Sequence, residues 1–166
     1  MYFHGCLAGI TLCVMGTVFG AENPAVMVNV ELFPVGSFTM TAPQVEGRGR
    51  KQANAFSAAE LKVAVASLDT GIQLRTTHLK QHLKADSFPY ITAKNILARN
   101  QHGSADLTIR DVTQKVTFTY VDLGNGSAQA TFKLNLPSFN LTGIKYLGVG
   151  VQDEVEVSAT VAYDNN

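Results

Sequence analysis

The sequence has very little cysteine. Only Cys6 and Cys13 are cysteines among its 166 residues, and both lie before Gly20. The chain beyond Gly20 therefore has no thiol from which to build a disulfide framework, a redox pair or a thiolate metal site. A domain that begins after this point must be stable through its hydrophobic core alone.

The sequence also lacks an excess of either charge. It has 13 basic and 13 acidic residues, all beyond Gly20, and its formal net charge is +0. This balance is unlike the basic footprint of a nucleic-acid-binding protein, so we expect no nucleic-acid partner. No linker, low-complexity tract or solenoid repeat interrupts residues 21–166, and we expect a single domain there.

Long apolar runs are missing except at the start of the chain. The uncharged run from Cys6 to Phe19 is closed by Gly20 and followed by a polar, proline-containing stretch. A membrane-spanning helix needs about 20 mostly apolar residues, and this run is shorter. The layout is typical of a secretory signal peptide over residues 1–20, so we expect export with cleavage after Gly20. A retained N-terminal anchor is the alternative.

The remainder of the sequence has a hydrophobic period of two. Apolar and polar residues alternate in at least five segments, near residues 26–33, 61–66, 116–121, 131–136 and 155–163. Such alternation predicts strands with one face turned to a core. About eight strands of this kind form either a closed barrel or a two-layer sandwich, and alternation alone does not distinguish them.

Turn and helix signals separate these strands. Gly124-Asn125-Gly126 predicts a hairpin, because these residues tolerate positive φ. Ile72–Lys84 contains good helix formers with leucines near helical spacing, which predicts one short helix. We expect His102 and Gly103 to lie in a loop.

Catalytic and metal-binding signals are weak. His78 and His82 stand four residues apart on the predicted helix, so both imidazoles share one face, but two ligands do not make a metal site and a structural role is favoured. Asp106, Asp111 and His78 belong to no catalytic motif, and Asp69 and Asp111 are explained more simply as turn formers. The sequence predicts no metal, no cofactor and no enzyme.

Several segments together resemble the YceI family, the lipocalin-like polyisoprenoid-binding proteins of bacteria. The similarity extends from about Val26 to Tyr163. It is carried by SLDTG at 67–71, LRTTHLK at 74–80, FPYIT at 88–92, DLTIRDVT at 106–113 and the segment 143–155 that leads into the last predicted strand.

The resemblance implies an all-β fold, a lipocalin-like antiparallel β-barrel of about eight strands with one short helix. It also implies a periplasmic protein that binds or carries an isoprenoid, such as a quinone or polyprenyl chain, or another long-chain lipid in an apolar cavity. The alternative is a barrel with a filled core that acts through its surface on a membrane-bound partner. The oligomeric state is left open.

The candidate ligand-binding residues are mostly aromatic. Phenylalanines spread over different predicted strands either line a tunnel or fill a core, and the pattern leaves both open. His78 is a candidate for contact with a ligand head group. The full set comprises Phe38, Phe56, Leu68, Leu74, His78, Leu79, Phe88, Phe118, Phe132 and Phe139.

Overall fold

The computed structural model describes residues 23–146 and 148–165. The predicted signal peptide, residues 1–20 with Cys6 and Cys13, lies outside the described residues. The strands are β1 (Val26–Phe33), β2 (Ser37–Ala42), β3 (Gly49–Gln52), β4 (Ala55–Ala64), β5 (Tyr90–Arg99), β6 (His102–Ile109), β7 (Val112–Asp122), β8 (Ser127–Asn135), β9 (Lys145–Tyr146), β10 (Val149–Val151) and β11 (Glu154–Asn165). The helices are α1 (Gln73–His82) and the 3-10 turns η1 (Val65–Ser67) and η2 (Leu136–Phe139).

The sheet closes into a barrel. Strands β3, β4, β5, β6, β7, β8 and β11 are hydrogen-bonded in this order, and β11 returns to β3 in a parallel pairing that sets Tyr163 beside Gly49. The prediction of an all-β barrel with one short helix is therefore confirmed. The sandwich that alternation left open is excluded, because the pairing of β11 with β3 completes the ring.

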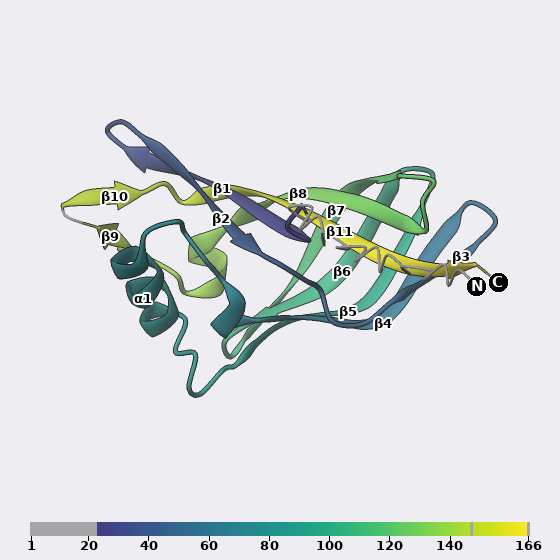
Figure 1. Ribbon diagram of the computed structural model, residues 1–166, viewed down its shortest axis with the longest axis horizontal. Coiled ribbons are helices and arrows are strands. Elements are labelled where there is room, and N and C mark those ends of the chain that lie inside the picture. Colours follow the sequence, from purple (N-terminus) through teal and green to yellow (C-terminus); the bar gives the residue numbers. More distant parts are fainter. Residues whose placement is uncertain (1–22, 147, 166) are drawn as a thin grey trace, which may run out of the picture.

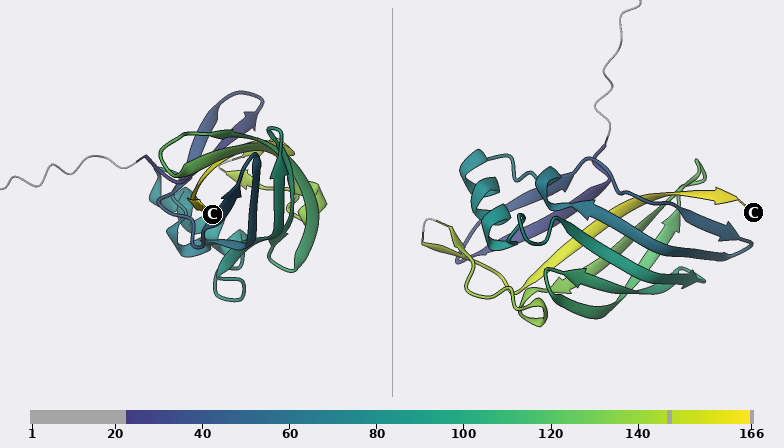
Figure 2. Two further views of the ribbon diagram at one scale, coloured as in Figure 1. Left: turned by 90° about the vertical axis from the view of Figure 1, so that its right-hand side faces the viewer. Right: turned by 90° about the horizontal axis from the view of Figure 1, so that it is seen from below.

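The remaining strands extend one end of the barrel. The first half of β11 pairs with β1 instead of β3, so that Val28 lies opposite Val157. Strand β2 continues this wall on one side of β1, and β10 with β9 continues it on the other. The barrel therefore has an extended end that is covered by α1 and a narrower end at β3 and the C-terminus (Figure 1). Figure 2 shows the ring of strands from the narrower end.

The predicted strands are present, with two differences in detail. The alternation of Val26, Val28 and Val30 places all three in the buried face of β1. The strand expected over residues 61–66 ends at Ala64, because Val65–Ser67 turns into η1. The loop expected at His102 was wrong, since β6 begins at this residue.

The predicted hairpin and helix are also present. Gly124 and Gly126 both have positive φ and connect β7 to β8. Helix α1 lies within the predicted range and is buried at none of its residues, although some of its side chains face the barrel interior. In the described part of the chain, no helix is long and apolar enough to cross a membrane.

Candidate functional site

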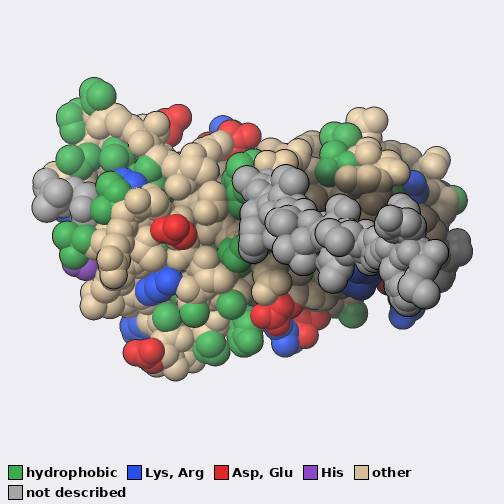
Figure 3. All heavy atoms as spheres, viewed as in Figure 1, with side chains coloured by type: hydrophobic (Ala, Val, Ile, Leu, Met, Phe, Trp, Pro, Cys, Tyr) green, Lys and Arg blue, Asp and Glu red, His purple; other side chains and the backbone are tan. Residues whose placement is uncertain are grey.

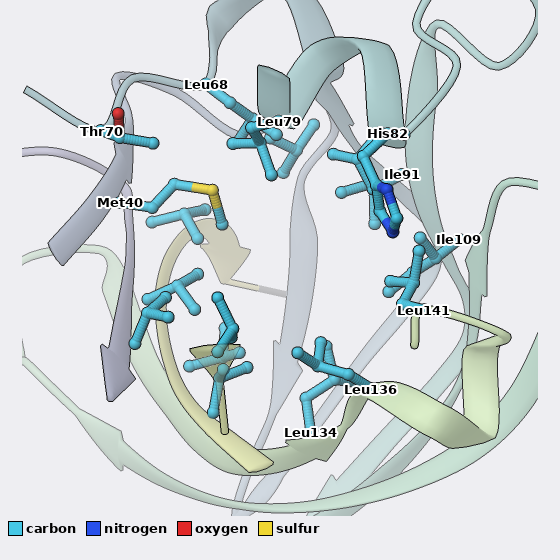
Figure 4. A pocket seen from close by; sticks show the side chains of 18 of the residues that line it. Met40, Leu68, Thr70, Leu79, His82, Ile91, Ile109, Leu134, Leu136 and Leu141 are labelled. Carbon is cyan, nitrogen blue, oxygen red and sulfur yellow. The ribbon is translucent and has the colours of Figure 1, made fainter. Parts of the chain in front are cut away.

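The extended end of the barrel encloses a cavity of about 450 Å³. Its walls are the inward faces of β1, β8 and β11, and α1 closes one side. Figure 4 shows side chains from these elements surrounding a central space. The aliphatic lining includes Val26, Val28, Val30, Met40, Ile91, Ile109, Leu134, Leu136, Leu141, Val155 and Val157. A concave apolar space of this size is typical of a small-molecule site.

The SLDTG segment holds α1 over the cavity. Asp69 accepts hydrogen bonds from the Gly71 amide at 2.9 Å and from the Thr76 hydroxyl at 3.1 Å. The backbone amide and carbonyl of Asp69 each form a hydrogen bond with the backbone of Thr41 in β2. The buried Thr70 adds a 2.9 Å hydroxyl contact with Thr76. These hydrogen bonds attach the first turn of α1 to β2. The pKa of Asp69 is lowered, and the hydrogen bond from the Gly71 amide is the largest cause.

The polar part of the cavity lining is basic. Arg75 donates a 2.7 Å hydrogen bond to the carbonyl of Thr70, and its guanidinium carbon lies 3.8 Å from the centre of the Phe38 ring. No aspartate or glutamate is among the described lining residues. The ionisable lining residues are Lys62, Arg75, His78, His82 and Lys145. A cationic ligand group would meet no described carboxylate here.

His82 presents a polar atom inside this apolar space. Figure 4 shows its imidazole beside Ile109 and Leu141. The Nε2 atom is buried and has no hydrogen-bond partner among the described residues. Burial lowers the pKa of His82, and the charge of Arg110 lowers it further, so the ring is neutral at neutral pH. A ligand with a polar group at this depth would supply the missing partner.

A second, smaller cavity of about 130 Å³ lies deeper in the barrel. Below it the barrel is closed by aromatic rings, since Phe56 meets Tyr120 and Tyr163 edge to face, each at a centroid distance of 5.0 Å. Asp122 accepts a 2.8 Å hydrogen bond from the Tyr163 hydroxyl and pairs with Lys51. The hydrogen bond from Lys51 is the largest cause that lowers the pKa of Asp122 to about 2.

The structure brings most of the predicted site residues to these cavities. Phe38, Leu68, His78, Leu79 and Phe132 line the large cavity. Phe56 and Phe118 line the small one, together with Phe132, which is shared.

Three candidates, Leu74, Phe88 and Phe139, line neither cavity. Leu74 is 52% exposed because it lies on the outer side of α1. Phe88 is half-buried in the loop before β5. Phe139 is 2% exposed because η2 places it within the packed core.

The aliphatic residues of the wall were not among the predicted site residues. A sequence signal for them existed, because Val155, Val157, Ala159 and Val161 occupy the inward positions of a strand that alternation predicts. Alternation tells which face a side chain occupies. It does not tell whether that face meets a neighbour or a cavity, and this explains the omission.

The residues considered for catalysis do not form one site. His78 lines the cavity, whereas Asp106 on the outer face of β6 accepts from Asn95 and lies 3.4 Å from Lys115. Asp111 is exposed in the two-residue turn between β6 and β7. Among the described residues, no group of three or more His, Cys, Asp or Glu is arranged to hold a metal ion.

Comparison with known proteins gives one family. The sequence profile of the YceI-like domain matches residues 22–163. A polyisoprenoid-binding domain from Saccharophagus degradans, implicated in plant cell wall breakdown, has 13% identity and a TM-score of 0.59, with 81% of this chain and 90% of that one covered. The YceI protein of Campylobacter jejuni has 17% identity and a TM-score of 0.56, with 93% and 98% covered. These likenesses establish the fold. No curated protein matches the chain.

Proposed function

The chain belongs to the YceI family, and on this premise we propose that it binds an isoprenoid or a similar long-chain lipid inside its barrel and carries it in the periplasm. The observation that carries the proposal is the apolar cavity of about 450 Å³ at the extended end. Burial of apolar surface is the dominant favourable contribution to the binding of such a chain. The polyisoprenoid-binding domain of Saccharophagus degradans has the same fold and supports the choice of ligand class.

The cavity lining favours a lipid with an uncharged or anionic head group. Arg75, His78 and His82 face the cavity from α1, and no described acidic side chain balances them there. The neutral His82 offers Nε2 for one hydrogen bond. The basic and neutral polar groups of the lining can hold a head group through hydrogen bonds, which suits binding, and we infer a carrier.

Two features support a carrier that exchanges lipid with a membrane. The predicted signal peptide over residues 1–20 directs the chain out of the cytoplasm. The β1–β2 hairpin at the cavity end terminates in Phe33 and Val35, which are 71% and 83% exposed. Figure 3 shows apolar side chains gathered on this end of the molecule. The alternative of a filled core does not fit the cavity, so binding inside the barrel is the better hypothesis.

Filling the cavity tests the proposal. Met40 faces the space (Figure 4), so Met40→Trp should occupy part of it and reduce retention of radiolabelled geranylgeraniol. Leu97→Trp is the matched control, because Leu97 is 64% exposed on β5. Wild type and Leu97→Trp should retain the compound after gel filtration. Equal retention by Met40→Trp, or none by wild type, would refute binding in this cavity.

Two further measurements test the natural ligand and the location. Organic extraction of protein purified from its native compartment, followed by mass spectrometry, should release a lipid. N-terminal sequencing of the periplasmic protein should begin at or near Ala21. A membrane-bound protein that retains Met1 would overturn the periplasmic location and leave the binding result standing.

A further inference from the structure

The large and small cavities are consecutive chambers of one barrel interior. Both are lined by the same ring of residues on β4, β5, β6, β8 and β11, which forms a waist between them. Three members of this waist are in register across adjacent strands, since Leu61 lies beside Ala93 and Ala93 beside Leu107. The complete waist is Leu61, Ala93, Leu107, Phe132, Ala159 and Val161.

Phe132 is the largest side chain of the waist. It extends from β8, where it lies opposite Val157 of β11, and it borders both chambers. It is only partly buried although it lies inside the barrel. Its ring therefore has open space on two sides, which a close-packed core residue does not have.

The deeper chamber exists because its inward positions carry small side chains. On β8 the inward residues below Phe132 are Ala130 and Ala128, and on β11 Ala159 lies opposite Ala130. Ala98 of β5 and Ala105 of β6 continue the pattern, since both line the chamber. A void in a core normally costs stability, so alanines that leave a chamber open indicate a ligand that fills it.

We propose that the alanine-lined chamber receives the distal end of the bound lipid chain, and that this chamber, entered past Phe132, sets the longest chain that the barrel accepts. This inference rests on the proposed function and adds a chain-length specificity to it. The chamber is closed by Phe56, Tyr120 and Tyr163, so the chain ends there. Its lining has no charged side chain among the described residues, so it takes only an apolar chain end.

The volumes indicate where the boundary lies. An apolar cavity of about 150 Å³ holds benzene, which is roughly 25 Å³ for each carbon. On this scale the large cavity, at about 450 Å³, accommodates about 18 carbons. The deeper chamber, at about 130 Å³, accommodates about 5 more, which is one isoprene unit. Geranylgeraniol should therefore fill the large cavity, and geranylfarnesol should also enter the deeper chamber.

The experiment compares geraniol, farnesol, geranylgeraniol and geranylfarnesol, each one isoprene unit longer than the last. Each added buried methylene group tightens binding by up to about fourfold. Wild type should therefore gain affinity at every step, including the last. Dissociation constants are measured by displacement of a fluorescent lipid from the delipidated protein.

Two variants separate the chambers. Ala130→Leu fills the deeper chamber and leaves the lining of the large cavity unchanged, because Ala130 borders only the former. Phe132→Trp narrows the waist itself. Ala130→Leu should bind farnesol as wild type does, and both variants should lose the gain in affinity from geranylgeraniol to geranylfarnesol, about tenfold or more. Ala162→Leu on the exposed side of β11 is the matched control and should behave as wild type.

The outcomes are distinguishable. The proposal is supported if Ala130→Leu and Phe132→Trp both lose the gain in affinity from geranylgeraniol to geranylfarnesol. An unchanged gain at the last step in folded variants overturns the chain-length role and leaves the proposed lipid binding intact. A wild type that binds none of the four prenols overturns the proposed function, and the chain-length role with it.

Discussion

Replacing Phe139 and Phe132 by alanine should distinguish a core ring from a cavity ring. Phe139 is 2% exposed and belongs to the packed core, whereas Phe132 is partly buried and borders both cavities. Both residues were candidate ligand-binding phenylalanines. The structure assigns them different surroundings, so their truncation should differ in its effect on the ligand-free protein.

The expected magnitudes follow from these surroundings. Phe139→Ala removes a fully packed ring and leaves a hole, which should cost about 3–5 kcal/mol of unfolding free energy. Phe132→Ala loses contacts on only part of its ring, and about 1–2 kcal/mol is expected. The total unfolding free energy of a domain is about 5–15 kcal/mol, so Phe139→Ala should remove a large share of it.

Urea unfolding of the delipidated proteins, followed by circular dichroism, measures both costs. A prenol added in excess should then stabilise wild type and Phe139→Ala by equal amounts and Phe132→Ala by a different amount, because Phe132 borders the cavities proposed to hold the ligand and Phe139 does not. Similar losses for the two variants would refute the reasoning. That result would mean that the cavity collapses in the ligand-free protein and that Phe132 packs as a core ring.

Three further predictions concern other parts of the barrel. Gly103→Ala should cost roughly 1–3 kcal/mol in urea unfolding, because the new Cβ would lie 2.3 Å from Phe118. Burial lowers the pKa of His82, so as the pH falls the unfolded chain binds a proton at His82 before the folded protein does. Wild type should therefore lose stability as the pH falls below about 6.5. The variant His82→Gln should show a smaller loss in thermal melts. The pKa of Asp122 is lowered to about 2, mainly by the hydrogen bond from Lys51. The ionised carboxylate therefore stabilises the fold above about pH 4, and this stabilisation is lost as the pH falls to about 2. The variant Asp122→Asn should be less stable at neutral pH and should lose less stability on acidification. For His82 or Asp122, an equal pH dependence of stability in wild type and variant would contradict the prediction for that residue.

The strands were predictable because each has one buried and one exposed face. Alternation in residues 155–163 therefore located β11 correctly. Closure was not predictable from alternation, because it depends on the parallel pairing of Tyr163 with Gly49, two residues far apart in the sequence. The resemblance to a barrel family supplied this missing information.

The candidate site was predictable in part. Helical periodicity placed His78 and Leu79 on a helix, and both face the cavity. Leu74 belongs to the segment that carries the family resemblance, yet it lies on the exposed side, because a short helix that covers a cavity need not have one continuous apolar face. Gly103 was expected in a loop, yet it lies inside β6 because the Phe118 ring needs the space of a side chain there.

Position along the barrel axis is the information that alternation does not contain, and β8 and β11 supply it once their register is known. Read from α1 toward the closed end, the inward pairs are Val155 with Leu134, Val157 with Phe132, then Ala159 with Ala130. Side-chain size thus falls below Phe132 and rises again at the aromatic floor. The rings and the hydrogen-bonded Asp122 stabilise the closed end without any ligand. Because that end is stable by itself, the extended end can leave an apolar cavity unfilled, which is the space that the proposed lipid chain would occupy.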